Sequence, residues 1–248
     1  GLGDVYKRQF LQREGAVLLE RADLVDQGLR DFQALAQGEL HLGASFTVGN
    51  YWLPHYLQRF SAAYPGINLR CTLANAAHIL EGTSQGRFDL GFVSGVSDAD
   101  QCPEMGPDLQ LDQVGTERLH LVVGPGHPWF GCMVLEASQL CQLPWVMREP
   151  GSGSQQMLLR FLDQAGIAVA DLPVMLQLTS SEMVKAVVAT GAAVAALPGT
   201  MVESEIGQRQ LWPLTIRDHD PGIQPIWMLR HPCRSLSPLI RTFADSLG

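Results

Sequence analysis

Residues 39–45, ELHLGAS, open the stretch of sequence that decides the fold. The pattern of their apolar residues predicts a strand. After it we expect helices and strands in alternation. A helix is predicted over 51–64 and ends at Pro65-Gly66, a strand over 67–73, a helix over 79–85 and a strand over 88–93. Short strands that alternate with helices indicate βαβ units and a parallel or mixed sheet.

A second series follows 97–115, a stretch that contains several prolines and glycines. Strands are expected over 119–123, 145–147, 174–178, 192–197 and 226–229, and helices over 155–165, 181–189, 201–206 and 238–247. The chain has 248 residues, which is enough for two α/β lobes of about 100 residues each. We therefore predict an α/β fold with two lobes.

The composition is that of a soluble globular protein. Hydrophobic residues make up 46% and charged residues 17% of the chain, and the mean hydropathy is +0.06. Because 17 basic residues stand against 25 acidic ones, the net charge is −8, and the chain lacks the basic excess that attracts nucleic acid or anionic lipid. The longest nearly apolar run, 186–197, is too short for a membrane helix of roughly 20 residues. Direct contact with nucleic acid and membrane insertion are therefore not expected.

Cysteines and histidines show no metal or redox pattern. The cysteines lack a C-x-x-C pair, which is typical of reduced thiols in a cytoplasm, and they are Cys71, Cys102, Cys132, Cys141 and Cys233. The histidines form no H-x-x-x-H or H-E-x-x-H pair, and they are His41, His55, His78, His120, His127, His219 and His231. Residues 12–14 interrupt the apolar run that a secretory signal needs. We expect a cytoplasmic protein without a metal or a cofactor.

The first 37 residues predict one long helix behind an unmatched end. Residues 1–9 show no helical or strand period. From Leu11, apolar residues recur in steps of four and three, as in the seam of a coiled coil, and this predicts a helix over 10–37. An ordinary amphipathic helix packed on its own domain would carry the same stripe. Since Gln37-Gly38 ends the helix just before an independent series begins, a protruding dimerisation helix is favoured.

Three predicted strand-to-helix junctions carry hydroxyl clusters, at 45–47, 152–154 and 179–181. Serine and threonine are ordinary N-caps, and this explains any one cluster. Three clusters together permit a second interpretation, because the carboxyl ends of strands in α/β sheets face a common crevice where helix N-termini attract anions. Arg148 would add a positively charged guanidinium group that can bind a carboxylate or oxyanion in a bidentate manner, or it would form a surface ion pair with Glu149.

No catalytic motif accompanies these hydroxyl groups. Ser152 lies between glycines, yet the G-x-S-x-G spacing is absent, and no Asp or His is tied to it by sequence. Residues 151–156 complete neither a dinucleotide fingerprint nor a phosphate-binding loop. We expect no catalytic residue. An enzyme of this architecture stays open only if a histidine, backed by a carboxylate, lies beside Ser45 or Ser152.

Several short motifs, in their order and spacing, resemble LysR-type transcriptional regulators over about residues 11–248. They are LQREGAVLLERA at 11–22, GASFTVGNYWLP at 43–54, Phe60 with YPG at 64–66, GRFDLG at 86–91, GHP at 126–128, REPGSGS at 148–154 and SEMVKAVVATG at 181–191. The resemblance implies a linker helix followed by an effector-binding domain with the type 2 periplasmic-binding-protein fold. Lobe I would comprise 39–117 and 230–248, lobe II would comprise 118–229, and the chain would cross the hinge twice.

The resemblance also implies an effector site in the cleft between the lobes. Its residues would be Ser45, Thr47, Ser94, Arg148, Ser152, Ser154, Thr179, Ser180 and Ser181. The run at 148–154 is similar to the branch associated with sulfur metabolism and small oxyanions, which implies a small anionic effector. Gln155, Ala76 and Ala193 depart from the pattern of that branch.

The same resemblance implies homodimers or homotetramers. They would contact DNA only through an N-terminal winged helix-turn-helix, which we expect to be missing from this sequence. The alternative is a solute-binding protein that feeds a transporter, because such proteins share the fold. A transport receptor would be a monomer with an export signal, whereas the helix predicted over 10–37 favours the regulator.

Overall fold

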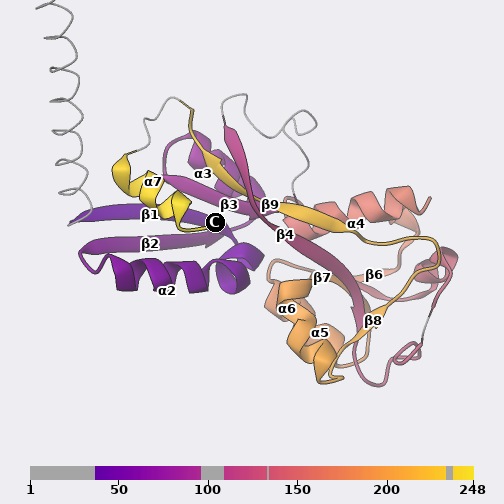
Figure 1. Ribbon diagram of the computed structural model, residues 1–248. Coiled ribbons are helices and arrows are strands. Elements are labelled where there is room, and N and C mark those ends of the chain that lie inside the picture. Colours follow the sequence, from indigo (N-terminus) through magenta and orange to yellow (C-terminus); the bar gives the residue numbers. More distant parts are fainter. Residues whose placement is uncertain (1–36, 96–108, 133, 233–236) are drawn as a thin grey trace, which may run out of the picture.

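Residues 37–95, 109–132, 134–232 and 237–248 are described by the computed structural model of the chain. Within them, helices and strands alternate and form two lobes (Figure 1). The predicted α/β fold with two lobes is confirmed. The end at 1–9 and the helix predicted over 10–37 lie outside the described residues, except for Gln37.

Lobe I is built on three parallel strands, of which β1 (Gly38–Ser45) lies between β2 (Ile67–Ala74) and β3 (Leu90–Ser94). A π-helical turn, η1 (Val48–Trp52), leads into α2 (Pro54–Ala63), while α3 (Ala76–Ser84) precedes β3 and α7 (Pro238–Asp245) ends the chain. Phe60 of α2 packs edge-on against Phe243 of α7, with ring centroids 5.0 Å apart, in the core on one face of the sheet. Ile79 of α3 is fully buried on the other face.

Lobe II repeats this plan with β5 (Trp145–Arg148) parallel to β6 (Val174–Leu178) and β7 (Val194–Pro198). Three helices cover it, namely α4 (Gly153–Gln164), α5 (Ser181–Ala189) and α6 (Gly199–Gly207). Two short 3-10 turns precede its strands, η3 (Ala137–Gln142) before β5 and η4 (Val169–Asp171) before β6. Trp145 of β5 and Phe161 of α4 belong to the core on one face. Val188 of α5 and Met201 of α6 belong to the core on the other.

Two long strands carry the chain between the lobes. Residues 110–118 of β4 (Gln110–Val123) pair antiparallel with β9 (Ile223–Arg230). Residues 119–123 pair with β7, and 121–123 also pair with β8 (Trp212–Leu214). The sheet is therefore continuous, in the order β2-β1-β3-β9-β4-β7-β5-β6. The two predicted crossovers are these strands, which cross between the lobes (Figure 1).

Glu117 ties the β4 crossover to lobe II. Its carboxylate is 2% exposed and accepts hydrogen bonds from the backbone N–H of Thr200 (3.2 Å) and from Thr200 Oγ1 (2.7 Å), at the start of α6. Burial raises the pKa of this carboxyl, although the bonds from Thr200 oppose that shift.

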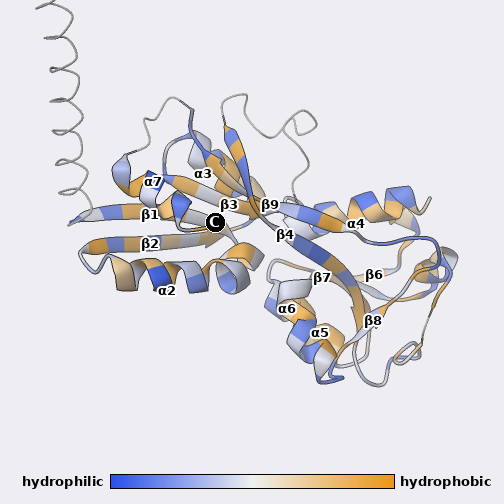
Figure 2. Cartoon of the chain, in the orientation of Figure 1, coloured by the Kyte–Doolittle hydropathy of each residue, from blue (hydrophilic) through white to orange (hydrophobic). Residues whose placement is uncertain are grey.

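The structure corrects our prediction from the sequence at two strands. β4 begins at Gln110, inside the stretch 97–115 that we predicted to connect the two series. Its part near the crossing is polar, and apolar residues prevail only from Leu119 onward (Figure 2), so the pattern did not indicate a strand. β8 was not predicted either, because it has three residues and contains Pro213. No helix in the described part of the chain is long and apolar enough to cross a membrane.

Candidate functional site: the cleft between the lobes

A narrow cleft lies between the lobes, at the carboxyl ends of β1, β3 and β5. Its lining comes from both lobes and consists of Ser45, Phe46, Thr47, Asn75, Ala76, Ser94, Arg148, Ser152, Gly153 and Ser154. The space within it that a water molecule can enter is about 10 Å³, which is the room of a single water molecule. Six of the nine residues predicted for an effector site therefore lie together here.

Five of the lining residues are buried hydroxyl side chains. Their exposed fractions range from 3% to 7%, and they are Ser45, Thr47, Ser94, Ser152 and Ser154. Ser152 Oγ and Ser154 Oγ are 3.1 Å apart. Ser45 Oγ is buried and has no hydrogen-bond partner among the described residues. An unpaired buried hydroxyl is costly, so Ser45 Oγ is the polar group of the lining that most lacks a partner.

Helix capping does not explain the hydroxyl groups of the cleft. Thr47 is the N-cap of η1 and Ser152 is the N-cap of α4, yet neither side chain makes a capping hydrogen bond. The first N–H groups of an α-helix have no partner inside the helix, and the helix dipole adds partial positive charge there. The start of the 12-residue α4 thus offers, at the same place, backbone donors and hydroxyl groups that do not cap the helix.

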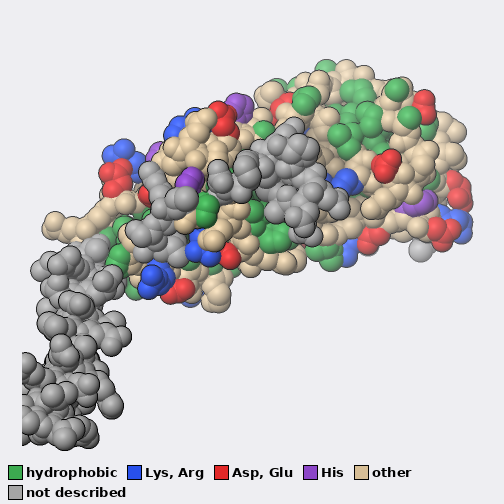
Figure 3. Space-filling view, turned by 90° about the horizontal axis from the view of Figure 1, so that it is seen from above, with side chains coloured by type: hydrophobic (Ala, Val, Ile, Leu, Met, Phe, Trp, Pro, Cys, Tyr) green, Lys and Arg blue, Asp and Glu red, His purple; other side chains and the backbone are tan. Residues whose placement is uncertain are grey.

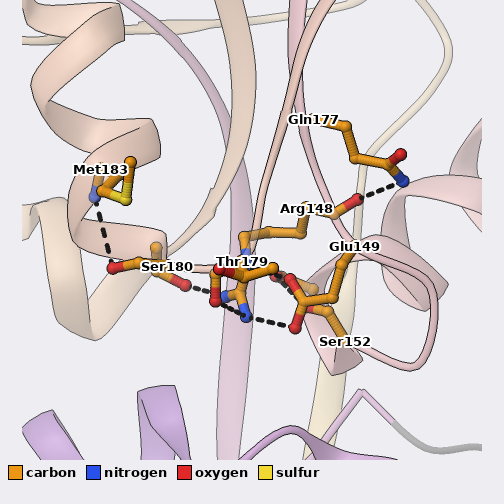
Figure 4. Close-up of polar contacts among 9 residues, drawn as sticks. Arg148, Glu149, Ser152, Gln177, Thr179, Ser180 and Met183 are labelled. Atoms are coloured by element: carbon orange, nitrogen blue, oxygen red, sulfur yellow. Dashed lines mark hydrogen bonds and ion pairs between the residues drawn. The ribbon is translucent and has the colours of Figure 1, made fainter.

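Arg148 ends β5, and its side chain is 4% exposed. Its Nε donates to Glu149 Oε2 at 2.8 Å, and one terminal nitrogen donates to Glu149 Oε1 at 3.0 Å (Figure 4). The same nitrogen donates to the Thr179 carbonyl oxygen at 3.3 Å, while the other terminal nitrogen donates to Ser181 Oγ. The ion pair with Glu149 that we considered for Arg148 is therefore formed, but in a buried position rather than on the surface.

The third hydroxyl cluster, at 179–181, contacts Arg148 and does not line the cleft. Thr179 and Ser181 accept hydrogen bonds from the guanidinium group. Ser180 is the N-cap of α5, and its hydroxyl accepts from the backbone N–H of Met183 at 3.5 Å (Figure 4). These residues position Arg148 and begin α5, and a direct contact between them and an effector stays a prediction.

Backbone contacts bring the two lobes together beside the cleft. A Cβ atom on Gly153 would lie 2.0 Å from the Ser94 carbonyl oxygen, so this close approach requires glycine. The backbone N–H of Ala77 donates to the Gly151 carbonyl oxygen at 3.4 Å. Phe46 of lobe I lies with its ring centroid 5.7 Å from Arg148 Cζ of lobe II. The cleft is thus closed by direct contacts between the lobes.

Four lining residues were not predicted, namely Phe46, Asn75, Ala76 and Gly153. Asn75 carried a signal, because it is an N-cap residue between a strand and an apolar helix, and its Oδ1 accepts from the backbone N–H of His78 at 3.0 Å. The described lining holds no histidine. Nor does the described part of the chain contain a group of three His, Cys, Asp or Glu residues that could hold a metal ion.

Comparisons with known proteins agree with this architecture. An uncharacterised HTH-type transcriptional regulator of Mycobacterium tuberculosis is 32% identical over 200 residues, which cover 77% of this chain and 61% of the regulator. The chain thus spans less than two thirds of the length of this relative. YeiE, an uncharacterised HTH-type transcriptional regulator of Escherichia coli, is 26% identical over 97% of this chain and 79% of its own. Both relatives are regulators rather than enzymes or transport receptors.

A solved structure shows the same fold. The regulatory domain of CcmR from Synechocystis PCC6803, in complex with 2-PG, superposes with a TM-score of 0.73 at 25% identity and covers 85% of this chain and 96% of its own. The family model described as the LysR substrate binding domain matches residues 33–248. The chain therefore belongs to the LysR family of transcriptional regulators and comprises their substrate-binding domain.

Proposed function

We propose that this chain is the effector-sensing and oligomerisation part of a LysR-type regulator, and that a small anionic molecule binds in the cleft between the lobes. The observation that carries the proposal is Ser45 Oγ, which is buried and unpaired beside four other buried hydroxyl groups. The start of α4 adds donors that favour an anion over a cation. The CcmR domain, which is similar at 25% identity, was solved with 2-PG bound, and this supports a small-molecule effector here.

The closed cleft suggests how binding would change the molecule. The space of about 10 Å³ in the cleft holds one water molecule, so an effector of several atoms that binds between the walls would require them to move apart. Binding would then select a different arrangement of the lobes. A shift of a two-state population from 1:99 to 99:1 needs about 5.5 kcal/mol of differential affinity, which several charge-assisted hydrogen bonds can supply. We expect no covalent chemistry.

The remaining functions would lie in the assembled regulator. We propose lobe boundaries at 39–117 with 230–248, and at 118–229, as the resemblance implies. Self-association into dimers or tetramers would use the helix predicted over 10–37. DNA would be contacted only through an N-terminal winged helix-turn-helix, in the cytoplasm.

Exposed apolar residues in lobe II support self-association. Figure 3 shows hydrophobic side chains gathered on this lobe, and its exposed large hydrophobic residues include Val174, Met175 and Leu176. All three lie on β6, which is an edge strand of the sheet. An exposed apolar edge is a usual contact surface for another chain.

Thermal unfolding against a panel of small anions tests the binding proposal, with sulfate, sulfite, thiosulfate, phosphate, acetate, benzoate and amino acids as probes. A ligand at 100 times its dissociation constant stabilises the folded state by about 2.7 kcal/mol. We expect a selective stabiliser whose effect is lost in S45A and R148A. S61A, at an exposed position of α2, is the control and should respond as the wild type does. Unchanged binding in both cleft variants would remove the cleft from the proposal.

A further inference from the structure

We infer that Glu149 sets the charge selectivity of the cleft, so that it accepts small oxyanions with one negative charge and disfavours those with two. The inference rests on the proposed function, since it concerns ligands of the same cleft. It follows from how the donors of Arg148 are used and from the formal charge that the cleft retains.

The donors of Arg148 are largely engaged within the protein. A guanidinium group has five N–H donors. Contacts among the described residues use four of them: two on Glu149, one on the Thr179 carbonyl oxygen and one on Ser181 Oγ. Arg148 therefore cannot bind a ligand with the bidentate pair of hydrogen bonds that we considered from the sequence, because Glu149 already accepts that pair.

The charge of the cleft follows from the same pairing. Arg148 is the one charged side chain in the described lining, and Glu149, with a side chain 15% exposed, cancels it. Arg160, further along α4, does not line the cleft and donates to the Gly95 carbonyl oxygen (2.7 Å) and to Gln224 Oε1 (2.9 Å). Within the described lining itself, what remains for a ligand is the partial positive charge at the start of α4, equivalent to about half a unit.

A ligand with one negative charge matches this environment. Its oxygens can accept from the hydroxyl groups, above all from Ser45, and from the first N–H groups of α4. A ligand with two negative charges would leave one charge uncompensated in a buried site, which is costly. Glu149, which lies outside the lining, thus acts on ligand charge through Arg148 as a specificity-determining residue.

Substitution of Glu149 tests the inference directly. Glu149→Gln keeps the size of the side chain and one oxygen acceptor for Arg148, but it leaves the charge of Arg148 uncompensated. At constant ionic strength, E149Q should bind sulfate and thiosulfate on the order of ten- to a hundredfold more tightly than the wild type. Its affinity for nitrate and acetate should rise less, so calorimetric titration should show a changed preference between anions of one and two charges.

Two further variants separate charge from structure. E39Q removes the same charge from an exposed ion pair with Arg70, at the opposite end of β1 from Ser45, and should bind every probe as the wild type does. R148Q/E149Q restores a neutral cleft and should lose the gain for sulfate. Because E149Q leaves a buried cation unpaired and could unfold, the double variant and the rescue of E149Q by sulfate keep the test decisive.

Each result decides the inference. A gain for sulfate in E149Q alone supports it. Wild-type binding that depends on Ser45, with E149Q binding all anions as the wild type does, overturns the charge selectivity and leaves the proposed function standing. A gain for sulfate in E39Q or in R148Q/E149Q overturns it as well. Absence of binding to any probe in wild type and in E149Q overturns both the inference and the proposed site.

Discussion

Two strand-to-helix junctions of lobe II carry the same kind of hydroxyl cluster and use it in opposite ways. Between β5 and α4, Ser152 is the N-cap without a capping hydrogen bond, and its hydroxyl group meets Ser154 in the cleft. Between β6 and α5, Ser180 caps its helix and Ser181 accepts from Arg148. The hydroxyl groups of the α4 junction therefore line the cleft without capping their helix, whereas those of the α5 junction bind α5 and Arg148.

The difference teaches where a binding site can form in such a fold. A hydroxyl group that caps a helix has its lone pairs engaged, and replacing it costs stability. A hydroxyl group that is buried without such a bond needs another partner. The first helical residue differs as well, because α4 begins with Gly153 against the Ser94 carbonyl of lobe I, while α5 begins with a serine. Contact with lobe I is what makes the α4 junction part of a cleft.

The largest effect is expected from Gly153→Ala. Its Cβ would lie 2.0 Å from the Ser94 carbonyl oxygen, and backbone cannot move aside as a flexible side chain can. We expect a loss of about 3 kcal/mol in the free energy of unfolding, at the upper end of the range for overpacking. Denaturant unfolding measures it. Gly199→Ala, at the first residue of α6, is the matched control, since its Cβ would meet no atom closer than 3.4 Å. Equal stability of the two variants would show that the lobes do not meet at Gly153.

Much of the fold follows from local patterns in the sequence. The predicted bounds of β6 and α5 agree with the structure residue for residue, and those of β1 and β2 agree within one residue, because their apolar periods are regular and their ends carry turn or capping residues. β4 could not be predicted in full. Its polar part is a strand only because β9, more than 100 positions away along the chain, pairs with it.

The cleft was predictable in location but not in detail. Hydroxyl groups after strands indicated the right edge of the sheet, and five predicted hydroxyl residues line the cleft there together with Arg148. Which hydroxyl caps a helix and which faces a cleft depends on the approach of lobe I, and this is a tertiary property. The contact between the Phe46 ring and Arg148 could not be predicted either, because it also depends on the approach of the two lobes.

A smaller effect is expected from Ser181→Ala. Ser181 is 5% exposed and accepts a hydrogen bond from the buried guanidinium group of Arg148. Loss of an acceptor for a charged donor should lower the free energy of unfolding by about 1.5–3 kcal/mol. Because the two residues act together, the losses in S181A and R148A should not add in the double variant, which a double-mutant cycle measures. Additive losses would mean that Ser181 stabilises α5 without supporting Arg148.

Ser180→Ala should cost still less, about 1 kcal/mol, because only the capping bond to the Met183 N–H is lost. Ser180→Asp keeps an acceptor at the N-cap and should retain the stability of the wild type. Neither variant should change the stabilisation by an effector, since Ser180 does not line the cleft. A reduced response to the effector in S180D would bring the α5 junction into the binding site and remove the contrast with α4.

The smallest effect on stability, and the sharpest contrast, is expected from S152A/S154A. The two hydroxyl groups are each other's partners at 3.1 Å, so removing both leaves no buried group unsatisfied. Neither residue uses its side chain to cap α4, and the helix should keep its N-terminus. The free energy of unfolding should therefore change by no more than about 0.5 kcal/mol, while stabilisation by an effector is largely lost. If S152A/S154A loses as much stability as S180A and is still fully stabilised by the effector, the hydroxyl groups of both junctions stabilise only their helices.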